Sequence, residues 1–71
     1  MDEDVFNLEV RKFLKRFGVT AQREIEKSVA AALQRGTLKG NEVLTVHATL
    51  TIPKVLPEFH IDGEIALANH T

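Results

Sequence analysis

Cysteine is absent from the 71-residue sequence, and so are tryptophan and tyrosine. Without cysteine the chain forms no disulfide, no thiolate metal site and no cysteine nucleophile, which fits a reducing compartment. Only the four phenylalanines could stack on nucleic-acid bases. No apolar run approaches the length of a membrane span, and the start, MDED, is acidic where a signal peptide is basic. We therefore expect a cytoplasmic protein without a membrane partner.

The chain is short for a fold that supports itself. We expect one domain over residues 1–71, in which a single core supplies only about 3–5 kcal/mol. Small domains usually add a disulfide, a metal or a partner subunit to such a core. Hydrophobic content of 44% argues for a packed fold, and the net charge of −1 provides no global attraction to nucleic acid or acidic lipid.

Two helices are predicted in the first half. Four apolar residues recur at helical spacing: Phe6, Val10, Phe13 and Phe17. Acidic residues precede this segment and basic residues follow, as the helix dipole favours. Gly18 would end the first helix, about residues 3–17, in the left-handed conformation. Thr20 would cap a second helix, about residues 21–35, which Gly36 would end.

Two strands are predicted in the second half, at about residues 43–52 and 58–68, with Pro53 to Pro57 as the loop between them. Apolar and polar residues alternate along both, so one face is apolar. Two registers keep the apolar faces together. The one we favour sets small residues opposite small ones and places His47 opposite Glu64. Its nearest rival places His47 opposite Asp62.

These elements predict an α+β fold in the order ααββ, with two helices packed on the apolar face of an antiparallel hairpin. A two-stranded sheet is marginal alone and leaves two open edges, so we expect a homodimer to complete it. The loop of residues 36–42 is long enough for the helices to cover either their own hairpin or that of the second chain.

The polar face of the hairpin is the first candidate site, with four residues that ligate metals or titrate: His47, His60, Asp62 and Glu64. Positions two apart on a strand are separated by roughly 6.6–6.8 Å, so two ligands converge easily. A third would come from a second chain or from His70. We therefore expect no metal and no cofactor, and favour a solvated sheet face over a metal- or proton-responsive site.

Catalysis has weaker support. The sequence has no G-x-S-x-G turn, its lone serine, Ser28, falls within a predicted helix, and a flat strand face lacks a concave pocket. We expect no catalytic residues and no enzyme. In the loop LKGNE, backbone amides resemble an anion site, but the loop follows a helix C-terminus, where the dipole disfavours anions, so we interpret it as a turn.

Two surface clusters remain. The basic residues of RKFLKR are Arg11, Lys12, Lys15 and Arg16, and Arg23 and Lys27 would extend them onto the second helix. Helix, glycine turn and helix also resemble a helix-turn-helix DNA-binding motif, but strands follow where a third helix is expected. The other cluster is Val55-Leu56 between the prolines, an exposed apolar loop tip or a cap over the end of the core.

The segments RKFLKRFGVTAQREIEKSV (11–29) and GTLKGNEVLTVHATLTI (36–52) resemble a family of short bacterial proteins known only as a domain of unknown function. The resemblance covers nearly the whole chain. It implies a free-standing, cytoplasmic, bacterial protein and carries no catalytic or binding residues. We therefore expect a small non-enzymatic protein that associates with itself or with another protein. The alternative is a nucleic-acid-binding accessory that uses the basic end of the first helix.

Overall fold

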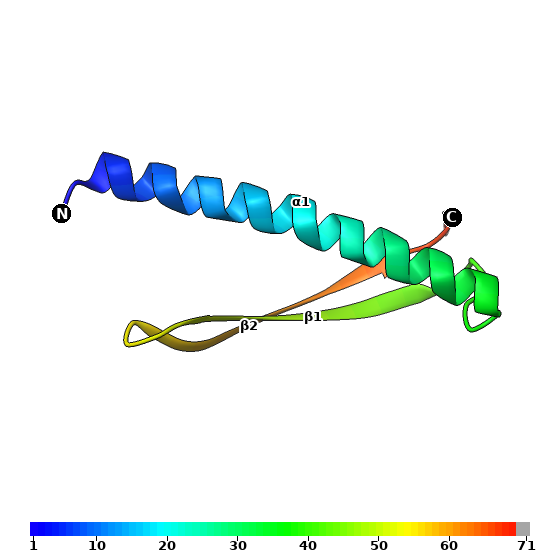
Figure 1. Cartoon of the computed structure of the whole chain (residues 1–71). Coiled ribbons are helices and arrows are strands. Elements are labelled where there is room, and N and C mark those ends of the chain that lie inside the picture. Colours follow the sequence, from blue (N-terminus) through cyan, green and yellow to red (C-terminus); the bar gives the residue numbers. More distant parts are fainter. Residues whose placement is uncertain (70–71) are drawn as a thin grey trace. The chain divides into compact units, whose positions relative to one another are not determined.

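The computed structural model describes residues 1–69 and divides the chain into two units, Met1–Thr37 and Leu38–Thr71. The first unit holds a single helix, α1 (Glu3–Arg35), drawn from blue to green in Figure 1. The second holds two antiparallel strands, β1 (Val43–Ile52) and β2 (Leu56–Ala66). The α+β class and the C-terminal hairpin are confirmed.

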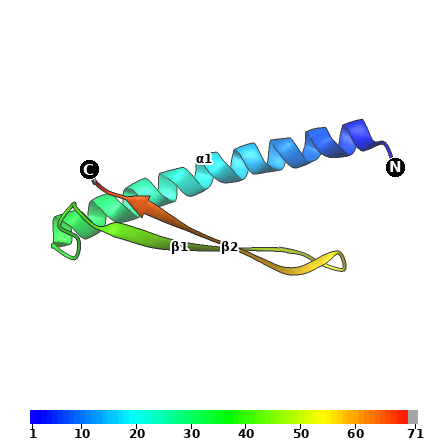
Figure 2. The same ribbon diagram turned by 180° about the vertical axis from the view of Figure 1, so that it is seen from behind.

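The predicted division into two helices is wrong, because α1 runs through Gly18 and Thr20 without a break (Figure 2). Gly18 does not adopt the left-handed conformation that ends a helix. A glycine inside a helix costs about 1 kcal/mol relative to alanine. A break would instead leave up to four N–H and four C=O groups without partners, at a site with a poor capping sequence. The apolar spacing also continues in phase from Phe17 to Ala21 and Ile25, so one helix keeps one apolar face.

Both ends of α1 have complete caps. The Asp2 side chain accepts a hydrogen bond from the Val5 amide at 3.1 Å, and Glu3 and Asp4 occupy the first turn. At the other end Gly36 has φ +81°, and the amides of Gly36 and Thr37 donate to the carbonyls of Leu33 and Ala32. This is the Schellman arrangement, and it confirms the predicted end of the helix at Gly36.

The hairpin has the register that we ranked second. β1 and β2 pair Leu44 with Ile65, His47 with Asp62, and Leu50 with Phe59. The favoured pairing of His47 with Glu64 is therefore wrong, and Glu64 lies opposite Thr45. Both registers keep the apolar residues on one face, so hydrophobic patterning alone does not choose between them. The turn chooses.

That turn is shorter than predicted. The Val55 amide donates to the Ile52 carbonyl at 3.0 Å, with Pro53 and Lys54 at the centre and Lys54 at φ +71°. A proline followed by a residue of positive φ is the pattern of a type II turn. β2 consequently begins at Leu56, and Pro57, which we placed in the loop, lies inside the strand.

A bulge near the turn accommodates this proline. Leu50 pairs with Phe59 and Ile52 with Leu56, so Pro57 and Glu58 together oppose the single residue Thr51. Proline occurs in sheets at bulges and on edge strands because it has no N–H for the ladder. β2 is an edge strand of a two-stranded sheet and has a bulge at this position. The extra residue shifts the rest of the ladder into its observed register.

Neither unit encloses large apolar side chains by itself. Within residues 1–69 only Ala32 is buried. One helix has no second layer to pack against inside its own unit, and the same holds for one two-stranded sheet. The apolar residues of the hairpin face, including Leu50, Phe59 and Ile61, remain exposed. Each unit by itself therefore lacks a packed core of large apolar side chains.

The continuity of α1 through Gly18 predicts opposite effects for two substitutions. Gly18→Ala should increase helicity, since a Cβ at this position meets no atom within 4 Å. Gly18→Pro should reduce stability by about 3 kcal/mol relative to the alanine variant, because proline removes a helical hydrogen bond and clashes with the preceding turn. Far-ultraviolet circular dichroism and thermal melting measure both. Equal helicity of the proline variant and the native chain would contradict an unbroken helix.

Candidate functional site

An apolar stripe follows one face of α1. We define it by seven side chains at helical spacing: Phe6, Val10, Phe13, Leu14, Phe17, Ala21 and Ile25. The phenylalanines at its N-terminal end are 50%, 42% and 49% exposed at positions 6, 13 and 17. Because α1 does not break at Gly18, the stripe continues across the position where two separate faces were predicted.

Two of its rings contact each other directly. The Phe13 and Phe17 rings are stacked, with centroids 6.3 Å apart and planes 8° from parallel. The Arg16 guanidinium lies 5.7 Å from the Phe13 ring centroid, within reach of a cation–π contact. These contacts hold the rings in place along the helix and add to the apolar area that a partner would meet.

The basic residues separate into two groups on the continuous helix. Lys12, Lys15, Arg16 and Arg23 surround a shallow depression with Val19 and Thr20. Arg11 instead borders a different depression, with Asp4, Asn7 and Leu8. We call the first group the basic face. Arg23 joins it because positions 12, 16, 19 and 23 share one side of a helix, a spacing that a helix end at Gly18 had hidden.

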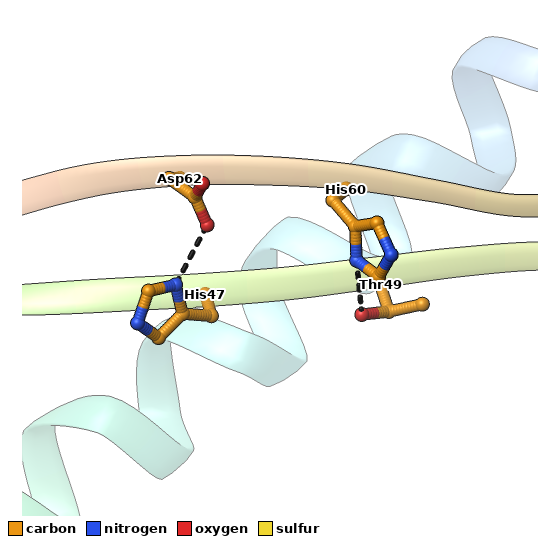
Figure 3. A network of polar contacts seen from close by, with 4 residues as sticks. All are labelled: His47, Thr49, His60 and Asp62. Carbon is orange, nitrogen blue, oxygen red and sulfur yellow. Dashed lines mark hydrogen bonds and ion pairs between the residues drawn. The ribbon is translucent and has the colours of Figure 1, made fainter.

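On the polar face of the hairpin, His47 of β1 and Asp62 of β2 form a close pair (Figure 3). The His47 Nδ1–H donates to Asp62 Oδ1 at 2.6 Å, and the two side chains are 73% and 68% exposed. This pair follows from the observed register, which sets the two residues directly opposite each other. At such exposure an ion pair contributes little to stability.

His60 lies next to this pair and contacts two neighbours. Its Nδ1 is 3.1 Å from Thr49 Oγ1 (Figure 3). Its Nε2 is 3.2 Å from Glu58 Oε2. A neutral imidazole that donates from Nε2 to Glu58 must accept at Nδ1, so the Thr49 hydroxyl donates to it. Glu58 was not predicted as a site residue, although it precedes His60 by two positions and therefore shares its strand face.

Hydroxyl, imidazole and carboxylate thus follow one another in the order found in acyl-transfer sites. Here the three groups lie on an exposed strand face, where water competes for each hydrogen bond, and His60 and Glu58 are 58% and 63% exposed. Such a site also requires preorganised donors for an oxyanion and a concave surface. We therefore interpret Thr49–His60 as a cross-strand pair that strengthens the hairpin, and Glu58–His60 as a contact between neighbours on the same face of β2.

The four metal-ligand candidates do not meet at one point. His47 pairs with Asp62, His60 contacts Glu58 and Thr49, and Glu64 lies opposite Thr45. In residues 1–69 no three His, Asp or Glu side chains are placed to hold a metal ion. His70, the third ligand considered from the sequence, lies outside the described residues.

The apolar tip of the hairpin is split between two environments. Val55 lies in the turn and is 76% exposed, whereas Leu56 is half-buried as the first residue of β2, opposite Ile52. The two residues of this contact candidate therefore differ in exposure, and Val55 is the more accessible of them.

The loop after α1 uses its backbone donors internally. The Glu42 carboxylate accepts hydrogen bonds from the Lys39 amide at 2.9 Å and the Gly40 amide at 2.9 Å. These are the amides that resembled an anion site in the sequence. A side chain of the same loop already occupies them, so the loop acts as a turn that leads into β1.

Glu42 also predicts a pH dependence. Hydrogen bonds from the amides of Lys39 and Gly40 lower the pKa of its carboxyl below the ordinary value of 4.5. Because the pKa is lower in the folded state, Glu42 stabilises the fold above pH 4.5, and this contribution is lost as the pH falls through the lowered pKa. Melting temperatures of Glu42→Gln should therefore depend less on acid pH than those of the native chain. Glu64→Gln, which removes a carboxylate from β2, is the control. Equal acid sensitivity of Glu42→Gln and the native chain would contradict the role of these hydrogen bonds.

Within the described residues, no helix combines the length and the apolar character needed to cross a membrane. Comparison with curated proteins and with solved structures yields no match. The family of unknown function DUF6494 matches residues 1–68, nearly the whole chain, which confirms the predicted resemblance to a domain of unknown function. With its single capped helix and its antiparallel hairpin, the chain belongs to this family of unknown function, DUF6494.

Proposed function

We propose that this chain is a small, non-enzymatic module that associates with itself through the apolar stripe of α1. The observation that carries the proposal is the stripe itself: large apolar side chains at helical spacing, exposed along one helix face. An exposed, contiguous apolar surface of this kind marks an interaction site. Burial of one such side chain contributes about 1.5–3 kcal/mol, so a partner that covers several would supply the stability that the chain lacks.

Self-association would also stabilise a helix and a hairpin that are each marginal alone. A helix depends on tertiary packing of its apolar face for most of its stability, and a two-stranded hairpin is marginal alone. A second copy adds apolar surface without any further component. For the polar hairpin face, His47 and Asp62 point to a solvated surface, because both side chains remain accessible while paired. This is the reason we prefer an interaction module to a metal- or proton-responsive one.

A matched pair of leucines tests the proposal. Leu14 belongs to the stripe and Leu8 lies on another side of α1, yet their exposures, 51% and 53%, are nearly equal. Leu14→Asp should shift the chain from dimer to monomer in sedimentation-velocity and light-scattering measurements, because it places a charge inside the contact. Leu8→Asp changes the same residue type at similar exposure and should leave the dimer intact. A folded native chain that stays monomeric at micromolar concentration would reject self-association.

The basic face supports a second candidate function, binding of nucleic acid. Lys12, Lys15, Arg16 and Arg23 converge on one side of α1, and phosphate backbones bind to such clusters largely by counterion release. The net charge of −1 and the acidic start of the helix oppose it. A helix-turn-helix motif no longer supports it either, because α1 is a single helix.

Retention on a DNA or heparin column tests the second candidate. If the basic face binds phosphates, the double variant Lys12→Glu/Arg16→Glu should elute at lower salt than the native chain, with a weaker dependence on salt. The double variant Lys39→Glu/Lys54→Glu, with its changes in the loop and the hairpin turn, is the control with the same change in net charge. If the native chain passes through at low salt, or all variants elute alike, nucleic-acid binding by this face is rejected.

A further inference from the structure

We infer that the second copy packs on the apolar stripe in antiparallel orientation, with the two helices crossing near Gly18. This inference rests on the proposed self-association and adds the orientation and the register of the contact. Three features of α1 support it: the distribution of charge along the helix, the distribution of side-chain size along the stripe, and an otherwise unexplained glycine.

Charge distinguishes the two possible orientations. In a parallel pair, Asp2, Glu3 and Asp4 would lie beside the same three acids of the second copy, and the basic run of residues 11–16 beside itself. In an antiparallel pair centred near Gly18, the acidic start approaches Arg35, and residues 11–16 face residues 20–25, where Arg23 and Glu24 cancel. The helix dipoles also attract in this arrangement. Charge complementarity therefore favours the antiparallel pair.

Ion pairs at the flank of the stripe fit the same register. Glu9 and Lys27 lie on the same side of the helix, five turns apart, and both border the stripe. In an antiparallel two-fold pair, equivalent flanks meet each other, so Glu9 of each copy approaches Lys27 of the other. Within one copy, Glu9 makes only a long contact of 3.8 Å with Lys12, at 63% exposure for both side chains. It is therefore accessible to an intermolecular partner.

Side-chain size changes along the stripe in a complementary way. The N-terminal part carries the large residues Phe13, Leu14 and Phe17, whereas the turn that follows carries only Ala21, before Ile25. Packed helices lie about 8–10 Å apart, at a distance set by the side chains in contact. Antiparallel pairing sets the large Leu14 opposite the small Ala21. Parallel pairing would oppose ring to ring at one level and leave a gap at the next.

Gly18 itself gains a role in this arrangement. It has no positive φ, and a Cβ built on it meets no atom within 4 Å, so the fold of one copy does not require a glycine here. The glycine nevertheless costs α1 about 1 kcal/mol relative to alanine. Gly18 borders the stripe at the level where the two helices would cross, and the missing side chain leaves space there for the second helix.

Cysteine cross-linking tests the orientation on a clean background, because the chain has no cysteine of its own. We choose Asn7→Cys and Ser28→Cys. Both positions are exposed, lie on the same side of α1 as the stripe, and come together in the antiparallel register. A mixture of the two variants should form a disulfide-linked dimer under mild oxidation, and each variant alone should not. In the antiparallel pair the two copies of either position are roughly 30 Å apart, far beyond the reach of a disulfide.

Each other outcome rejects the inference. Cross-linking of either variant with itself indicates a parallel pair. A dimer in sedimentation without any cross-link places the contact on another surface, which overturns the antiparallel stripe and leaves self-association standing. A monomer in sedimentation rejects both, so the two proposals fail in distinguishable ways.

Charge reversal gives a second measurement if a cysteine variant does not fold. Glu9→Lys and Lys27→Glu should each weaken dimerisation roughly tenfold in Kd, since each change opposes like charges at two symmetric places. The two changes together should restore the native Kd. Lys54→Glu in the hairpin turn is the control for net charge. A combined variant that dimerises no better than the single ones would overturn the Glu9–Lys27 register.

Discussion

The unbroken hydrogen-bond ladder of α1 through Gly18 is the constraint on which the other features depend. It keeps the apolar residues before and after the glycine in phase, so seven side chains form one stripe rather than two short faces at an angle. The same ladder aligns Arg23 with Lys12 and Arg16 on the basic face. A turn at this glycine would have divided both surfaces and changed which residues a partner can contact together.

Within the hairpin, the turn has a comparable role. The Pro53-Lys54 turn starts the ladder, and the bulge at Pro57 and Glu58 shifts it by one residue. The resulting register pairs His47 with Asp62 and leaves Glu64 opposite a threonine. The acids and imidazoles therefore form separate contacts, His47 with Asp62 across the strands and His60 with Glu58 along β2, instead of one converging cluster. A lysine with positive φ in this turn is strained relative to glycine, and the strands on either side hold it in place.

Much of this architecture could be predicted from local residue chemistry. β1, the division of the hairpin into an apolar and a polar face, and the helix end at Gly36 follow from alternation and from a glycine cap. The predicted helix break at Gly18 was wrong. Gly18 resembles the end of one helix and Thr20 the N-cap of the next, but the apolar residues keep helical spacing across both positions, and that spacing is the stronger indication of a single helix. The predicted register was wrong because both pairings keep the same apolar residues on one face. The turn that selects between them requires Lys54 in a conformation that lysine rarely adopts.

Pro57 has a consequence for how the sheet can grow. A two-stranded ribbon offers its outer backbone groups to any extended peptide, which is how edge-to-edge fibrils begin. A proline and a bulge in β2 interrupt the regular row of donors and increase the local twist near the hairpin turn. An extended peptide would therefore pair poorly with β2 along that stretch, which limits edge-to-edge growth of the sheet.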